Sequence, residues 1–164
     1  MEDNRKDLLT DFIEEPQLIQ ASGGKRFINF LVDYIIFIAL LFGAGILWAL
    51  LSPDTISAIN DNAGSGIIDR ILTLLLYGFY MGCVEAVTRG RSLGKLITGT
   101  KAVNEDGSVL RAGTAFKRGF SRVVPFEIFS ALGAPSYPWH DKWNHTYVVD
   151  IKQSYILTGS DQIR

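Results

Sequence analysis

Two carboxylates interrupt the most apolar parts of the 164-residue chain. Asp33 lies in the segment from Phe27 to Leu51, and Glu85 lies in the segment from Ile71 to Val87. A carboxylate inside a bilayer costs about 3 kcal/mol in insertion, so it should face protein or water and have a partner. Two carboxylates at similar depth can share a proton or hold a cation. The pair therefore predicts a cation or proton site, to which Asn29 would add an oxygen ligand.

Two other interpretations of these carboxylates stay open. Arg26 and Lys95 are basic residues near the same ends of the two segments, and they can neutralise the carboxylates as structural ion pairs. Asp141 is a further charge partner, which with Arg26 would neutralise or gate the inner mouth of a path. The third interpretation is a site for a polar small molecule or a lipid headgroup.

Other short motifs give little support for catalysis or metal binding. The stretch GRSLGK from Gly90 to Lys95 is one residue short of a phosphate-binding loop, and Leu96 stands where that loop has a hydroxyl residue. His140 and His145, with an aspartate between them, match no standard spacing of metal ligands. Cys83 is the only cysteine. We expect no enzyme activity, no cofactor and no metal site.

The two apolar segments predict transmembrane helices. Residues 27–51 would form a helix of about 37 Å, enough to cross a hydrocarbon core of ~30 Å. Residues 67–88 form the second predicted span. The segment 52–66 contains no lysine or arginine, whereas residues 89–118 contain seven. The positive-inside tendency therefore places residues 1–26 and 89–118 in the cytoplasm and predicts a helical hairpin.

Composition supports one membrane domain without a nucleic-acid partner. Hydrophobic residues make up 48% of the chain, and the net charge is -1. Residues 1–24 contain six acidic and two basic residues, so they predict an acidic cytoplasmic segment rather than a cleaved signal peptide. The membrane domain is expected at residues 25–151, followed by a C-terminal tail at residues 152–164. The lipid bilayer is the expected partner.

A third helix is expected at about residues 114–134. Lys117, Arg118 and Arg122 share one helical face, so this helix should lie in the cytoplasmic interface with these side chains toward lipid. A third membrane crossing is the alternative.

Further along the chain, Asp106 and Gly107 predict the turn of a small cytoplasmic β-hairpin. A second β-rich run, residues 145–152, can pair with residues 101–103 instead. On the second span, Gly78, Gly82 and Ala86 form a ladder of small residues, which we expect to pack against the first span. The predicted fold class is thus an α-helical membrane protein with a transmembrane hairpin, an interfacial or third transmembrane helix, and a β-hairpin.

Together these motifs resemble the RDD family of small bacterial integral membrane proteins over about residues 20–151. KRFINFLVDYII carries an arginine and an aspartate, and WHDKWNHTYVV carries the second aspartate of the family name. GRSLGKLITGTKAV is similar to a family stretch that usually has threonine at the serine position. An arginine-bearing helix follows the Asp-Gly turn. The residues that carry the resemblance are Arg26, Asp33, Ser92, Gly94, Lys95, Gly99, Arg118 and Asp141.

The resemblance implies an integral protein of the bacterial inner membrane, and some family members are thought to take part in cation–proton exchange. We therefore expect transport of a monovalent cation or proton through the intramembrane carboxylate site. The alternative is a non-transporting membrane adaptor that binds anionic lipid or a partner protein through its basic cytoplasmic face. Two or three helices cannot enclose a path alone, so a homo-oligomer is expected.

Overall fold

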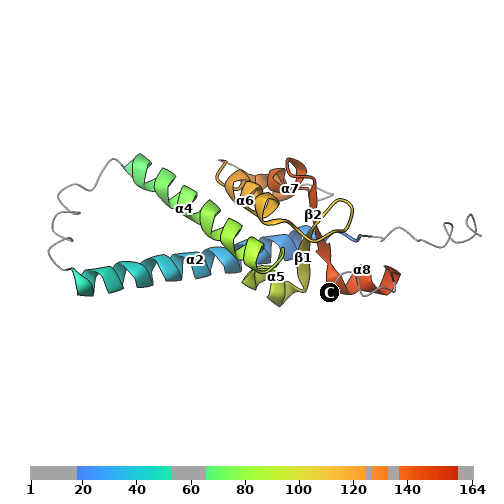
Figure 1. Ribbon diagram of the computed structural model, residues 1–164, viewed down its shortest axis with the longest axis horizontal. Helices are drawn as coiled ribbons and strands as arrows, with labels where there is room; N and C mark the ends of the chain where they lie inside the picture. Colours follow the sequence, from blue (N-terminus) through green and yellow to red (C-terminus); the bar gives the residue numbers. More distant parts are fainter. Residues whose placement is uncertain (1–17, 53–65, 125–126, 133–136, 159–164) are drawn as a thin grey trace, which may run out of the picture.

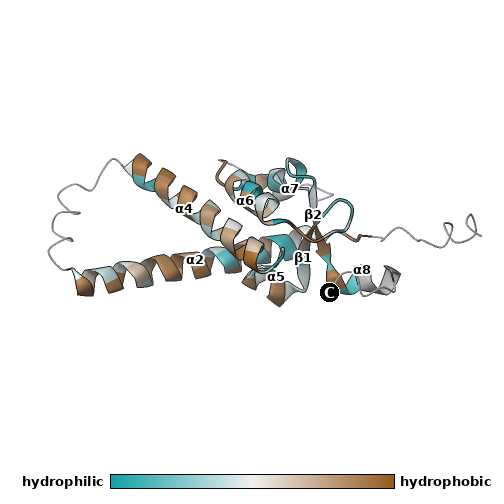
Figure 2. Cartoon of the chain, in the orientation of Figure 1, coloured by the Kyte–Doolittle hydropathy of each residue, from teal (hydrophilic) through white to brown (hydrophobic). Residues whose placement is uncertain are grey.

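Two long helices, α2 (Gly23–Leu51) and α4 (Gly66–Val87), extend side by side and then diverge in the computed structural model of Figure 1. The structure describes residues 18–52, 66–124, 127–132 and 137–158. Both helices are apolar along most of their length (Figure 2), yet only 6% of the most apolar window of α2 and 22% of that of α4 are buried. A core helix of a soluble protein would be mostly buried. These exposed apolar surfaces are therefore typical of helices that cross a bilayer.

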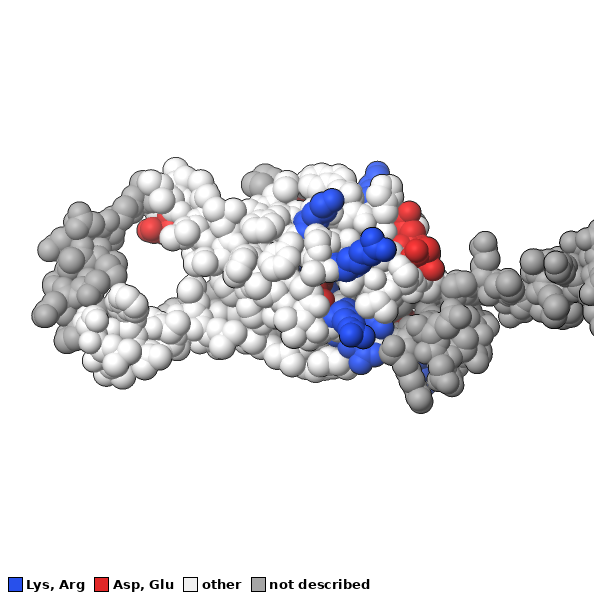
Figure 3. All heavy atoms as spheres, viewed as in Figure 1, with Lys and Arg blue, Asp and Glu red and all other residues white. Residues whose placement is uncertain are grey.

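The charged residues lie away from this apolar region. On the face shown in Figure 3, an uncharged belt covers the middle of the long helices, with one acidic patch at their left end, and lysine and arginine gather with a second acidic patch where the other elements pack. Most of the predicted segments 1–24 and 52–66 lie outside the described residues.

Aromatic rings form the contact between the two long helices. The Phe37 ring lies 5.2 Å from that of Tyr77 and 5.5 Å from that of Tyr80, centroid to centroid. Phe37, Tyr77 and Met81 are the buried members of this cluster. Toward the other ends of the helices, Trp48 and Ile67 are exposed. The spans therefore touch near their polar ends and separate beyond them.

The glycine ladder of α4 packs against α6 (Ala112–Ser121), not against α2, so that prediction was wrong. A Cβ atom at Gly78 would lie 2.9 Å from the Gly119 carbonyl oxygen, and one at Gly119 would lie 2.3 Å from the Gly78 oxygen. At Gly82, the added atom would lie 3.1 Å from the Phe116 Cα. Glycines on both helices are needed for this close backbone contact. Because α6 covers Gly78 and Gly82, this face of α4 is not open for contact with another helix.

The predicted third helix, residues 114–134, is not one helix. α6 ends at Ser121, turns follow, and η1 (Glu127–Leu132) is a separate 3-10 helix. Pro125, which lies outside the described residues, accounts for the break because proline disfavours helix at the residue before it. With ten residues, α6 is about 15 Å long, too short to cross the bilayer. The third-crossing interpretation therefore finds no support in α6.

A two-stranded antiparallel sheet joins distant parts of the chain. β1 (Thr100–Asn104) follows the short helix α5 (Leu93–Thr98), and β2 (Thr146–Asp150) follows α7 (Trp139–Lys142). The register pairs Thr100 with Asp150 and Asn104 with Thr146. The predicted hairpin around Gly107 is present only as a turn with one isolated bridge, Val103 to Val109. The alternative pairing with the later β-rich run is the one that forms, because it buries Ala102, Val103, Val148 and Val149.

The residues just before α2 add to the sheet. The Ala21 nitrogen donates to the Val148 oxygen at 2.8 Å, and the Asp150 nitrogen donates to the Ile19 oxygen at 2.9 Å. Gln20 forms a bridge with Val149. The beginning of the first span is thereby fixed to β2. After β2, the predicted tail begins as helix α8 (Ile151–Thr158).

Candidate functional site

Buried polar side chains from seven elements (α2, α4, α5, β1, α6, α7 and β2) meet where the long helices approach the sheet. Their relative exposure is at most 7%, and several are fully buried. The set comprises Arg26, Asn29, Asp33, Glu85, Ser92, Lys95, Thr100, Arg118, Asp141 and Thr146. Ten polar side chains in one buried region must satisfy one another, because few waters reach such a site.

Glu85 of α4 is surrounded by three cations. Its Oε1 accepts from the Lys95 Nζ at 2.5 Å and from an Arg122 terminal nitrogen at 2.8 Å, and its Oε2 accepts from the Arg118 Nε at 2.9 Å. Burial lowers the pKa of Lys95 to about 8, although Glu85 acts in the opposite direction. Glu85 is thus held as the shared anion of an ion-pair network.

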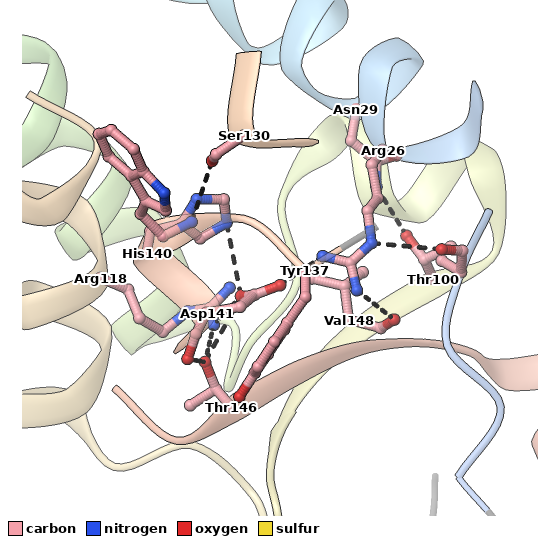
Figure 4. A network of polar contacts seen from close by, with 12 residues as sticks. Arg26, Asn29, Thr100, Arg118, Ser130, Tyr137, His140, Asp141, Thr146 and Val148 are labelled. Carbon is pink, nitrogen blue, oxygen red and sulfur yellow. Dashed lines mark hydrogen bonds and ion pairs between the residues drawn. The ribbon is translucent and has the colours of Figure 1, made fainter. Parts of the chain in front are cut away.

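Asp141 of α7 is bound by two arginines. Arg26 and Arg118 lie on either side of its carboxylate in Figure 4, and Arg118 also donates to the Thr146 hydroxyl. Burial alone would raise the pKa of Asp141, but Arg118, His140 and Arg26 outweigh it and lower the pKa below its usual value. Arg118 therefore bridges two buried carboxylates that come from different parts of the chain.

Asp33 is held in a different way. The Ser92 hydroxyl donates to its Oδ2 at 2.5 Å and the Gly94 backbone nitrogen donates to its Oδ1 at 2.9 Å. Among the described residues no lysine, arginine or histidine forms an ion pair with Asp33. Asp33 therefore fixes the first turn of α5 to α2 with neutral donors alone.

Asn29 and Gly94 complete this contact between α2 and α5. The Asn29 side-chain amide is hydrogen-bonded to the hydroxyls of Thr98 and Thr100 in either orientation of the amide. A Cβ atom at Gly94 would lie 2.4 Å from the Asn29 carbonyl oxygen, so only glycine allows α5 to approach α2 this closely.

His140 and Glu127 form a second, smaller pair. The His140 Nδ1 lies 2.5 Å from the Glu127 Oε1. Burial lowers the pKa of His140 below its usual value, although Asp141 and Glu127 act in the opposite direction. Over the residues that the structure describes, no group of three or more His, Cys, Asp or Glu side chains is arranged to hold a metal.

A cavity of about 330 Å³ lies against this cluster. Asp33 and Asn29 line it on one side, Arg122 and Tyr77 line it on another, and apolar side chains such as Val123 form much of the rest. The Tyr77 hydroxyl and the Arg122 Nε are buried and make no hydrogen bond with a described residue. The cavity thus combines apolar walls with polar groups that have hydrogen-bonding capacity left.

The sequence suggested that Asp33 and Glu85 form a carboxylate pair. In the structure each has its own set of partners, and they share none of them. The charge-partner candidates Arg26, Lys95 and Asp141 are all in ion pairs of the network. For Glu85, the structure thus shows the structural ion pairs that the sequence analysis gave as one of its open interpretations.

The prediction that Arg118 and Arg122 face lipid was wrong. Arg118 is fully buried and the Arg122 side chain is 11% exposed, because carboxylates of α4 and α7 bind them, whereas Lys117 is exposed. Sequence reasoning missed Tyr77, Thr146 and the role of Arg118. The signal for Arg118 was Glu85 itself: a buried carboxylate in an apolar helix needs cations, and Arg118 is one of the few basic residues that could supply one.

Two exposed apolar helices with a buried ionic cluster at their base are typical of a membrane protein. A model of the RDD family matches residues 20–149, and the chain belongs to this family of membrane proteins. The resemblance seen in the sequence is thereby confirmed. No curated protein and no solved structure matches the chain.

Proposed function

We propose that this RDD-family protein moves a monovalent cation or a proton across the membrane by binding it at Asp33. The observation that carries the proposal is the contrast among the buried carboxylates. Glu85 contacts three cations and Asp141 contacts two, whereas Asp33 contacts only a hydroxyl and a backbone N–H. A buried carboxylate without a contacting cation is the one free to take a cation or proton.

The position of Asp33 supports the same proposal. It lies on the first candidate span, and it lines the cavity between that span and α4. A carboxylate has about four acceptor positions, and the two hydrogen bonds of Asp33 leave others for a ligand. Asn29, which also lines the cavity, would supply a further oxygen.

Proton movement in proteoliposomes tests this function. The purified protein is reconstituted with a pH-sensitive dye inside, sodium or potassium is added outside, and Asp33→Asn is compared with wild type. Asparagine can keep both hydrogen bonds, because the Ser92 hydroxyl accepts as well as donates. We expect the cation-dependent proton signal to be lost in Asp33→Asn and kept in Asp69→Asn, a matched change at an exposed position of α4. An unchanged signal in Asp33→Asn would exclude Asp33 as the transport site.

We further propose that the charged side of the molecule faces the cytoplasm of a bacterial inner membrane and that the protein is a homo-oligomer. The gathering of lysine and arginine beyond the uncharged belt supports this orientation. Two candidate spans that separate along their length do not enclose a path by themselves, which supports assembly. Reporter fusions at residue 58 and the C-terminus test the orientation, and the mass of the protein in nanodiscs tests the assembly.

A membrane adaptor is the second candidate. The exposed basic residues Arg89, Arg111, Lys117 and Lys142 favour it, since they offer a surface for anionic lipid or an acidic partner. Charge reversal of Lys117 and Lys142 should then abolish the tethering of phosphatidylglycerol vesicles to nanodisc-held protein. Tethering that persists in this variant would argue against the adaptor.

A further inference from the structure

The cavity beside Asp33 opens next to both candidate spans. Tyr34 of α2 and Leu74 of α4 line it and are 41% and 40% exposed, so they mark its mouth. Both residues belong to the apolar surfaces that face the bilayer. A ligand could therefore enter from the membrane with its apolar part still among the lipid chains.

Three aromatic rings line the cavity from its mouth inward and lie close to one another. The centroids of Phe30 and Tyr34 are 5.7 Å apart, and those of Tyr34 and Tyr77 are 5.9 Å apart. Such rings offer apolar area and also attract a cation over their faces. The volume of about 330 Å³ is at the lower end of the range for small-molecule sites.

Two buried polar groups in this wall have hydrogen-bonding capacity left. Tyr77 is 5% exposed, and its hydroxyl lies close to the Arg122 guanidinium but has no acceptor for its own proton among the described residues. One terminal nitrogen of Arg122 binds Glu85, while its Nε makes no hydrogen bond of normal geometry with a described residue. Buried donors are rarely left unpaired, so a ligand oxygen is expected at this position.

The charges around the cavity limit which ligand fits. Leaving His140 aside, the cluster and the cavity wall contain four cations and four carboxylates. A bare cation at Asp33 adds one positive charge to this buried region, which limits it to weak, transient binding. A ligand with one charge of each sign leaves the balance unchanged, so it can stay bound. The charged residues are Arg26, Lys95, Arg118 and Arg122 on one side and Asp33, Glu85, Glu127 and Asp141 on the other.

We propose that the cavity binds the phosphoethanolamine headgroup of a bilayer phospholipid. A phosphate oxygen accepts hydrogen bonds from the Tyr77 hydroxyl and the Arg122 Nε, the ammonium group donates to Asp33, and the acyl chains leave past Tyr34 and Leu74. This inference rests on the proposed function, since it takes Asp33 as the cation-binding group and names the cation as the ammonium of a zwitterionic lipid.

Titration of the purified full-length protein with short-chain phospholipids tests the site. The probes are dihexanoyl-phosphatidylethanolamine, dihexanoyl-phosphatidylglycerol, which lacks the ammonium, and dihexanoyl-phosphatidylcholine, whose ammonium has no N–H. We expect phosphatidylethanolamine to bind at least tenfold more tightly than either of the others. Equal affinity for the three lipids would overturn the proposal.

Two matched pairs of variants locate the site. Tyr77→Phe should weaken phosphatidylethanolamine binding about tenfold, the effect of losing one hydrogen bond to a charged group, and Tyr80→Phe, which lies outside the cavity wall, should not. Leu74→Trp should block the mouth, whereas Leu75→Trp, exposed on the same helix, should bind normally. Binding that is unaffected by both Tyr77→Phe and Leu74→Trp would overturn the site.

The two proposals fail separately. Cation-dependent proton movement that is lost in Asp33→Asn, without selectivity among the three lipids, would sustain the transport function and overturn the lipid site. Selective phosphatidylethanolamine binding without cation-dependent proton movement would sustain the lipid site and exclude an inorganic cation as the substrate.

Discussion

Replacing Arg118 with methionine should destabilise the protein strongly. Arg118 is fully buried and binds Glu85 and Asp141, so its removal takes one cation from each of two buried carboxylates. Methionine has a similar length and no charge, so the loss of packing is small. Breaking a buried ion pair by removing one partner typically costs about 3–5 kcal/mol. For a chain of this size, this corresponds to a fall in Tm of roughly 6–20 °C.

Thermal unfolding of the purified protein in detergent measures this effect. The adjacent variant Lys117→Met is the matched control, because Lys117 is exposed and its replacement should change the unfolding free energy by less than about 0.5 kcal/mol. In Arg118→Met, Asp141 keeps Arg26 and Glu85 keeps Lys95 and Arg122, so the buried cluster has one negative charge in excess. Adding Asp141→Asn removes this excess charge and should recover part of the loss. If Arg118→Met melts within a degree or two of Lys117→Met, the network does not hold the fold together and the reasoning is refuted.

The remaining predictions concern helix packing and pH. Gly119→Ala should lower the unfolding free energy by about 1–3 kcal/mol, because its Cβ would lie 2.3 Å from the Gly78 oxygen. Gly113→Ala is the control and should not destabilise the protein, because a Cβ there meets open space. Equal melting temperatures of the two variants would contradict the close α4–α6 contact. Lys95 has a folded-state pKa of about 8, below the ordinary 10.5, so the folded state binds fewer protons between these values and its stability rises with pH there. The Tm of wild type should therefore rise relative to that of Lys95→Gln between pH 8 and 10, and parallel curves would show that Lys95 does not titrate in this range.

The two long helices and the position of Asp33 were accessible from the sequence. An apolar stretch of about 25 residues with a single ionisable residue has few structural solutions, because a bilayer demands that backbone groups be satisfied within the helix. A single aspartate in that stretch is a candidate site for the same reason. The order of the family motifs also led to the correct family.

The partners of α6 were not accessible. The pattern of Lys117, Arg118 and Arg122 is that of a basic face on a surface helix, and nothing local distinguishes the exposed lysine from the two arginines. Their burial depends on Glu85 and Asp141, which are distant in the chain and are brought together by tertiary structure.

For the glycine ladder and the sheet, too, the sequence carried a local signal but did not identify the partner. Small residues on α4 show that another backbone can approach closely, but not which one, and α6 is the element that does so. The Asp106-Gly107 turn is a local signal, whereas the pairing of β1 with β2 is decided by the apolar surface that the two strands bury together.

The attachment of the start of α2 to β2 has a consequence for biosynthesis. Arg26 finds its partners, the Asp141 carboxylate and the Val148 oxygen, only after most of the chain has been made. The partners of Asp33, at Ser92 and Gly94, also appear after the second span. The first helix therefore has to enter the membrane while its polar end is still unpaired, and a ribosome that stops before residue 139 releases a chain with Arg26 uncompensated.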